Sequence, residues 1–193
     1  DVYPTFRFKQ YYNDDYKFFV SHGGNGFGKI FGRINDCDYA LTCLRAADAF
    51  YPLLSEENTA LISKLSGKAH EYGYISRNED GSINEKKSGS EIWRNWENKL
   101  IRETYRAANA AEMAGNYGRV QGAVAMAALV LDSEPESKQM IEWVYRYGET
   151  KYGGEEATQT GGLLSSKLVD DVDRDGVANE AAPIYNIGWI GDL

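Results

Sequence analysis

The sequence predicts an all-α fold built from antiparallel helical hairpins, and three observations support this. From residue 36 onward, apolar residues recur at three- and four-residue steps, which places them on one face of each successive helix. Turns that contain glycine, asparagine or proline separate these segments. No segment of any length alternates polar and apolar residues as a half-buried strand would. Packed helical hairpins are therefore the expected architecture.

Composition limits the class of protein. The chain has 193 residues, enough for one domain with a core, and 42% of them are apolar. A net charge of −8 argues against nucleic acid as a partner, because phosphate binding needs clustered lysine and arginine. The sequence lacks a run of about 18 apolar residues, so no membrane-spanning segment is expected. The aromatic content of 13% fits either core packing or a carbohydrate-binding cleft.

Residues 1–35 are expected to form an extended, glycine-rich lead-in to a domain that covers residues 36–193. Within the lead-in, His-Gly-Gly-Asn-Gly-Phe-Gly-Lys-Ile at 22–30 matches the first part of a phosphate-binding loop. Ile30 stands where that loop has a magnesium-binding hydroxyl, and Gly32 interrupts the helix that should follow. A flexible glycine-rich loop is the favoured interpretation.

Two helices are predicted in the first half of the domain. The first follows an Asn35/Asp36 cap and ends at Pro52, and its apolar stripe is Cys37, Leu41, Leu44, Ala47, Tyr51 and Leu54. Ser55 is expected to cap the second, whose stripe is Leu61, Leu65, Ala69 and Tyr72. Cys37 and Cys43 lie roughly 9 Å apart along one helix axis, so both are expected to be free thiols in or near the core.

A polar connection over 73–90, expected to be mobile, leads to the central part of the sequence. One helical stripe there is Trp93, Trp96, Leu100, Thr104, Ala107, Ala111 and Ala114, and the next is Val120, Val124, Ala127 and Leu131. Between them, Gly115 suits the position just past a helix C-terminus and Asn116 suits an N-cap. This polar turn, residues 115–118, could present side chains at the mouth of a helical array.

Two more helical segments are predicted after residue 132. Ser133-Glu134-Pro135-Glu136 matches a capping box with proline in the first turn. The helix that it opens stops near Gly148 and carries Met140, Ile141, Val144 and Tyr147. A weaker helical segment is expected between the pairs Gly153-Gly154 and Gly161-Gly162, ending near Leu168.

Carboxylates are dense near the C-terminus. Asp171, Asp173, Asp175 and Gly176 occupy the first, third, fifth and sixth places of a calcium-binding loop. The twelfth place, where a bidentate glutamate belongs, is Ala182. An acidic surface turn is therefore favoured, with a calcium site at the three aspartates as the alternative. No cofactor and no other metal is expected.

Two segments together resemble a known family. Gly115-Asn116-Tyr117 stands at the start of an apolar helix, and Asp175-Gly176-Val177 is followed by Glu180-Ala181-Ala182-Pro183-Ile184-Tyr185. This pair resembles the heparinase II/III-like superfamily of polysaccharide lyases, which includes alginate lyases. In that family the first motif commonly reads Gly-Asn-His and the second roughly Asp-Gly-x-x-x-Glu-x-Ser-Pro-x-Tyr. The resemblance covers about residues 36–190 and departs at Tyr117, where His is usual, and at Ala182, where Ser is usual.

The resemblance implies a carbon–oxygen lyase that cleaves an acidic, uronic-acid-containing polysaccharide by β-elimination. Such a reaction removes a poorly acidic C5 proton, so the neighbouring carboxylate must be neutralised and a proton-transfer group must be close. Asn116 would neutralise the carboxylate, Tyr117 would assist it, and Tyr185 would transfer the proton. The expected substrate-binding residues are Trp96, Arg119 and Glu180. The departure at Tyr117 leaves the substrate class open.

As a base, Tyr185 would need its pKa lowered from about 10 by a nearby cation. The candidates for that cation are Arg119, Arg94 and Arg102.

The family also implies what surrounds this site. It implies a periplasmic or secreted protein with an (α/α) toroid, of which this chain would form an incomplete part that exposes an apolar patch along its last helices. His22 and His70 stand at no matching motif. A missing C-terminal part of the same protein, or a partner chain, is therefore expected to complete the site. Whether residues 1–193 alone are active stays open.

Two other functions remain open from the sequence. An inverting glycoside hydrolase on the same toroid would use two carboxylates roughly 6.5–9.5 Å apart, for which the candidates are Glu97, Asp175 and Glu180. A non-catalytic helical carbohydrate-binding or assembly module is the alternative from a different class. Formation of an unsaturated uronate product would separate the lyase from both.

Overall fold

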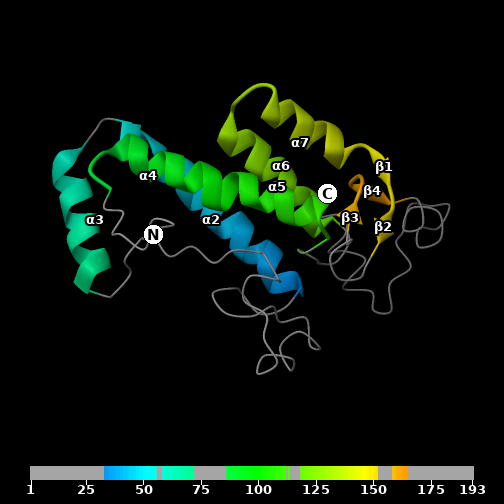
Figure 1. Cartoon of the computed structure of the whole chain (residues 1–193), viewed down its shortest axis with the longest axis horizontal. Helices are drawn as coiled ribbons and strands as arrows, with labels where there is room; N and C mark the ends of the chain where they lie inside the picture. The colour runs from blue at the N-terminus through cyan, green and yellow to red at the C-terminus, as the bar shows by residue number, and fades with distance from the viewer. Residues whose placement is uncertain are drawn as a thin grey trace, which may run out of the picture.

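The computed structural model describes residues 33–55, 58–71, 86–111, 113, 118–151 and 158–164. These residues are mostly helical, which confirms the all-α class. The helices are α2 (Arg33–Ser55), α3 (Thr59–Glu71), α4 (Gly89–Trp96), the π-helical segment η2 (Glu97–Ile101), α5 (Arg102–Asn109), α6 (Arg119–Leu131) and α7 (Glu136–Val144). In Figure 1, the α4–η2–α5 helix runs antiparallel to α2, and α6 and α7 form a second layer beside them.

Helix α2 is longer at both ends than the sequence predicted. It begins at Arg33, so Asp36 lies within its first turn and is almost fully buried instead of capping it. It continues through Pro52 to Ser55, whose hydroxyl donates to the Pro52 carbonyl over 2.9 Å. A proline this close to the C-terminus removes one backbone hydrogen bond, which the last turn tolerates. Tyr51 is exposed, and the buried face consists of Cys37, Ala40, Leu44, Ala47 and Leu54.

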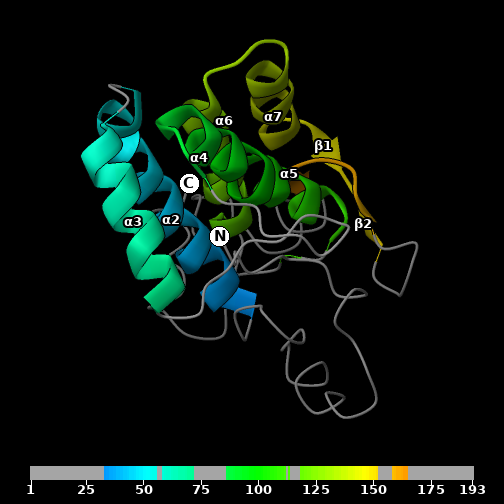
Figure 2. The ribbon, with the colours of Figure 1, turned by 60° about the vertical axis from the view of Figure 1, so that its left-hand side comes forward.

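Helix α3 lies at the edge of the array, where it begins next to the C-terminal end of α2 and then runs away from it (Figure 1 and Figure 2). Its cap is Asn58, whose Oδ1 accepts a hydrogen bond from the Leu61 backbone N–H over 3.0 Å, so the predicted cap at Ser55 is wrong. Ile62 is buried with 3% of its surface exposed, whereas Leu65 is 45% exposed. The predicted stripe through Leu61 and Leu65 is therefore wrong, because α3 packs against the rest of the array through Ile62.

The helical stripe predicted from Trp93 to Ala107 is confirmed as one continuous helix formed by α4, η2 and α5. Ser88 caps it, since its hydroxyl accepts from the Glu91 backbone N–H over 3.2 Å. The helix ends at Asn109, and Ala111 has a positive φ of 50°. The predicted extension of the helix to Ala111 is therefore wrong, and Ala114 and Gly115 lie outside the described residues.

Helix α6 is the central element, because α2, α5, η2 and α7 all pack against it. Its buried residues include three alanines, which let neighbouring helices approach closely: Ala123, Ala127 and Ala128. The N-cap is Gly118, with φ 94° and ψ −38°, a conformation that glycine adopts without a Cβ penalty. The prediction that Asn116 caps this helix is therefore wrong.

In the described residues, four short strands, β1 to β4, follow α7 and lie at the right of Figure 1. The described residues of this segment, 147–151 and 158–164, are here called the hook. β1 (Tyr147–Gly148) pairs in parallel with β4 (Leu163–Leu164), and β2 (Thr150–Lys151) pairs antiparallel with β3 (Thr158–Gln159). The helical segment predicted between Gly153-Gly154 and Gly161-Gly162, and ending near Leu168, is wrong for residues 158–164, which contain β3 and β4 instead. The Trp143 indole N–H donates to the Gln159 carbonyl over 3.1 Å and holds the hook on α7.

Glycine is required in this hook because its backbone touches α7 directly. A Cβ added at Gly162 would lie 2.5 Å from the Val144 carbonyl oxygen, and one at Gly161 would lie 2.3 Å from the Arg146 carbonyl oxygen. The close approach of the two backbones explains why side chains are excluded at these two positions.

The start of α7 also differs from its prediction. Its N-cap position is Pro135, without a side-chain cap, and the Ser137 hydroxyl accepts from the Ser133 backbone N–H over 2.9 Å. The expected capping box at Ser133 is therefore wrong. Large apolar side chains exposed on the described part of α6, α7 and the hook are Leu129, Tyr145 and Tyr147. A continuous apolar patch along this edge stays a prediction.

A bidentate ion pair joins α5 to α7. Arg102 donates from Nε and Nη2 to the two carboxylate oxygens of Glu136, each over 2.8 Å. These bonds lower the pKa of Glu136 and raise that of Arg102. Glu136 lies in the first turn of α7, where a negative charge is also favourable.

We expect Glu136→Gln to reduce stability near neutral pH and to lose that effect in acid. Because the folded pKa of Glu136 lies below its ordinary value of 4.5, the carboxylate stabilises the fold above about that pH. The contribution disappears as the pH falls through the lowered folded pKa. Urea unfolding of wild type and variant between pH 7 and pH 3 measures it, with Glu134→Gln as a charge-matched control. A difference between wild type and Glu136→Gln that stays constant with pH would contradict the prediction.

Candidate functional site

The candidate site is the end of the array at which α6 begins, here called the α6 entry. The connection from α5 to α6 carries the predicted residues Asn116 and Tyr117, which lie outside the described residues. Met113, within this connection, is buried with 1% exposed, and its backbone N–H donates to the Ala107 carbonyl over 3.2 Å. The connection is therefore attached to the core at Met113, two residues before the turn predicted at 115–118.

An ion pair fixes the first residue of α6. Arg119 donates from Nη1 to the Asp38 carboxylate at the start of α2. The Arg119 side chain is 27% exposed and the Asp38 side chain 52% exposed, so the pair lies at the surface of the α6 entry. Asp36, buried in the same turn of α2, adds a second acidic residue to this end. The guanidinium is thereby placed at the positive end of the α6 dipole.

Gln121 ties the α6 entry to the hook. Its Oε1 accepts from the Gly118 backbone N–H over 3.0 Å, and its Nε2 donates to the Gly162 carbonyl over 2.7 Å. The side chain is 4% exposed, so both bonds are shielded from water. Because one buried amide satisfies backbone groups of two elements, the start of α6 and the hook hold each other in place.

A further charged pair, of which the carboxylate is buried, lies nearer the middle of α5. Arg106 donates from Nε and Nη2 to the two carboxylate oxygens of Glu103, each over 2.7 Å. Glu103 is 8% exposed, which is unusual for a carboxylate and requires such a partner. The bidentate geometry satisfies the charge within one helix.

Trp96 is not brought together with Arg119. It lies on α4, thirteen residues before the end of α5, which corresponds to about 20 Å along the helix. It is part of an aromatic row in which the ring centroids of Tyr51 and Trp93 are 4.7 Å apart and those of Trp93 and Trp96 6.2 Å apart. Tyr51 is exposed and both tryptophans are half-buried. Trp96 and Arg119, the two predicted substrate-binding residues that the structure describes, therefore lie in different parts of the array.

The three arginines predicted as cations near Tyr185 also lie in different parts of the array. Arg102 is held by Glu136, with Glu97 a further partner at 3.4 Å from its Nη1, so it serves the contact between α5 and α7. Arg94 lies exposed on α4, two residues before Trp96 and away from the α6 entry. Of the three arginines, Arg119 alone lies there. Glu97, a candidate hydrolase carboxylate, also contacts Arg102.

Tyr39 is the described tyrosine closest in sequence to Asp38, and it is a poor candidate for a base. Burial, followed by its hydrogen bond with Cys43, raises the pKa of the Tyr39 phenol. Burial likewise raises the pKa of the Cys43 thiol. Both groups therefore stay protonated at neutral pH. Cys37 is buried and Cys43 half-buried, and both are free thiols, as predicted.

Several predicted residues lie outside the described residues: Asn116, Tyr117, Asp171, Asp173, Asp175, Glu180 and Tyr185. Within the described ranges, no three His, Cys, Asp or Glu side chains gather in a group that could hold a metal ion. None of the described helices has the length and apolar character needed to cross a membrane.

Sequence reasoning missed Asp38 and Gln121. Gln121 had a detectable signal, since a glutamine three residues after a helix N-cap is typical of a side chain that returns to the cap backbone. The assignment of the cap to Asn116 concealed it. Asp38 had no local signal, because its partner Arg119 is 81 residues away.

Comparisons with known proteins identify no relative. No family model matches the chain, and no curated protein and no solved structure is significantly similar to it.

We expect Gln121→Leu to destabilise the fold by about 2–6 kcal/mol. The substitution keeps the side-chain size but leaves the Gly118 N–H and the Gly162 carbonyl buried without partners, at about 1–3 kcal/mol each. Gln139→Leu, at an exposed position of α7, is the matched control and should change stability by less than about 0.5 kcal/mol. Chemical denaturation measures both. Equal effects of the two substitutions would disprove the role of Gln121.

Proposed function

We propose that this chain is the helical part of a polysaccharide lyase that cleaves an acidic, uronic-acid-containing polysaccharide by β-elimination. The observation that supports it most is the location of Arg119 at the start of α6, directly after Asn116, Tyr117 and Gly118 in the sequence. A helix N-terminus favours a bound carboxylate, and Arg119, which also pairs with Asp38, is a cation at the same place.

The proposed chemistry divides between two motifs. Asn116 would donate hydrogen bonds to the uronate carboxylate, so that negative charge can move into it as the C5 proton leaves. Tyr185 would accept that proton or return one to the leaving oxygen, and Tyr117 would assist. Glu180 would contact the sugar. Arg119 is held by Asp38, so it would act as an oriented charge near the carboxylate.

The proposed architecture is an incomplete (α/α) toroid. The alternating direction of α2, the α4–η2–α5 helix, α6 and α7 supports it, because a toroid is built from successive antiparallel helical hairpins. A C-terminal part of the same protein or a partner chain would supply further helices and the remaining catalytic groups. Periplasmic or secreted localisation is part of the same proposal.

A specific observation favours a second candidate, a non-catalytic carbohydrate-binding module. The row of Tyr51, Trp93 and Trp96 is partly exposed, and aromatic rings of this kind stack on sugar faces. This row lies about 20 Å from the α6 entry, so it could bind sugar without any chemistry there.

We expect incubation with uronate polysaccharides to produce an absorbance increase from the unsaturated product. The experiment uses the full-length protein. Asn116→Ala should lower the elimination rate on the order of 10²–10³-fold, by analogy with the loss of one oxyanion donor. Tyr185→Phe should abolish elimination while substrate binding is kept, since only a hydroxyl is removed. Tyr145→Phe, at an exposed tyrosine after α7, is the control and should leave the rate unchanged.

The other outcomes separate the alternatives. Release of reducing ends without the absorbance increase would replace the lyase with a hydrolase. Binding without either product would leave the carbohydrate-binding module.

A further inference from the structure

Helix α3 is attached to the array through Ile62. Among the α3 side chains that the structure describes, Ile62 alone is buried, with 3% of its surface exposed. It forms a small apolar cluster with Leu54 at the end of α2 and Ile92 in α4. Helices α2, η2, α5, α6 and α7 all contribute buried residues to the larger core cluster, and the described residues of α3 do not. This helix is therefore held differently from the others.

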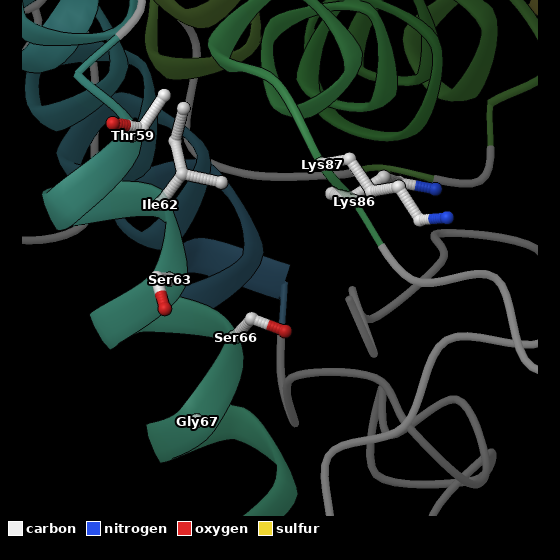
Figure 3. Close-up of a pocket in the computed structure, with 7 residues that line it drawn as sticks. All are labelled: Thr59, Ile62, Ser63, Ser66, Gly67, Lys86 and Lys87. Carbon is white, nitrogen blue, oxygen red and sulfur yellow. The ribbon is translucent and has the colours of Figure 1, made fainter.

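A hollow of about 470 Å³ lies between α3 and the segment that leads into α4. Residues of both line it: Thr59, Ile62, Ser63, Ser66 and Gly67 from α3, and Lys86 and Lys87 from the segment. In Figure 3, the Lys86 and Lys87 side chains extend away from α3. Protein interiors leave few voids larger than a water molecule, so this side of α3 is loosely packed.

The sequence of α3 gives the helix little stability of its own. It has 13 residues, and an isolated helix of that length is marginal in water. Gly67 lies in its interior, where glycine lowers helix stability relative to alanine. The ion pair between Lys68 and Glu71 is more than half exposed at both residues, and such pairs contribute little. Formation of α3 therefore depends on the contact that Ile62 makes with the array.

The surface under α3 is held in place by other contacts. Gly89, at the start of α4, lies so close to the end of α2 that an added Cβ would overlap the Leu54 carbonyl oxygen. Helices α2 and α4 also pack against each other, as Figure 1 shows. Trp93 packs against the small cluster and against the larger core, so it joins the two. Leu54 and Ile92 are therefore fixed by contacts that do not depend on α3.

We propose that α3 is a detachable cover, which opens as a unit while α2 and α4 stay packed and so uncovers an apolar surface formed by Leu54 and Ile92. An element with few buried contacts opens at a much smaller free-energy cost than the core, because the remaining structure stays folded. The structure shows the closed form, and the open form is a minor state in equilibrium with it. The proposal is independent of the proposed function, since it involves neither the α6 entry nor a sugar.

Native-state hydrogen exchange of the whole chain at low urea concentrations tests the opening. We expect the amides of residues 63–68 in α3 to exchange on the order of 100-fold faster than those of residues 124–130 in α6, yet more slowly than in an unfolded peptide. Exchange in α3 should depend only weakly on urea, because its opening exposes little surface. Exchange in α6, where eight of 13 residues are buried, should depend steeply on urea, since it requires global unfolding.

Substitutions within α3 identify the opening unit. Gly67→Ala should slow exchange in α3 by about two- to fivefold, because an added Cβ there contacts nothing and acts only through helix stability. Ile62→Ala should accelerate exchange in α3 by at least about tenfold, because it removes the buried contact. Leu65→Ala, at an exposed position of the same helix, is the matched control and should change exchange by less than about threefold.

A core substitution separates local opening from global unfolding. Met140 lies in the larger core on α7, where 2% of its surface is exposed. Met140→Ala should accelerate exchange in α6 by at least about tenfold, because it destabilises the folded core. Exchange in α3 should stay the same, since the core remains folded when α3 opens.

Ile92→Cys tests whether the opening uncovers the apolar surface. We expect the thiol at position 92 to react with a thiol reagent at a rate that Gly67→Ala lowers by about two- to fivefold and Met140→Ala leaves unchanged. Cys37, which is 0% exposed in the larger core, is the internal control, because it needs global unfolding to react and should react faster in Met140→Ala. Peptide mass spectrometry assigns the label to each thiol.

Three results would overturn the proposal. Equal acceleration of α3 and α6 exchange by Met140→Ala would mean that α3 opens only on global unfolding. Exchange in α3 at the rate of an unfolded peptide would mean that α3 does not cover the surface. A thiol reaction at position 92 that Gly67→Ala does not slow would mean that another part of the chain controls access to it.

Discussion

The close packing of α6 against its neighbours is the constraint on which the rest of the structure depends. Alanines at Ala123, Ala127 and Ala128 leave room for α2 and α7 to approach, and Ala40 and Ala47 do the same on α2. Protein interiors are packed at crystal-like density, so the distance between these helices is set by the size of these side chains. The positions of the α6 entry and of the hook follow from it, because Arg119 bonds to Asp38 of α2 and Gln121 bonds to Gly162 of the hook.

This packing separates two ends of the array with different chemistry. At the α6 entry, Arg119 and Asp38 form an ion pair at the first residue of α6. At the other end, Tyr51, Trp93 and Trp96 form a partly exposed aromatic row.

The sequence predicted the helices well where one face alone determines packing. The stripes from Trp93 to Ala107 and from Val120 to Leu131 lie on helices, because burial of an apolar face dominates over local propensity there. The sequence-based prediction failed where contacts between residues distant in the sequence determine which side chains are buried. Leu65 is exposed and Ile62 buried because α3 meets the array at an edge. The hook depends on close contacts of Gly161 with the Arg146 backbone and of Gly162 with the Val144 backbone, which no local pattern reveals. For the candidate site, the position of Arg119 at a helix start could be predicted, whereas its partner Asp38, 81 residues distant, could not.

The most direct test of this account is a pair of substitutions on adjacent positions of α2. Ala47 is buried in the cluster that contains the α6 alanines, and Ala46 is exposed. Enlarging Ala47 to leucine should lower the free energy of unfolding by about 1–3 kcal/mol, because the close-packed core has no room for the added methylenes. Ala46→Leu should change it by less than about 0.5 kcal/mol. If Ala47→Leu is as stable as wild type, the close packing of α2 on α6 does not hold the structure together.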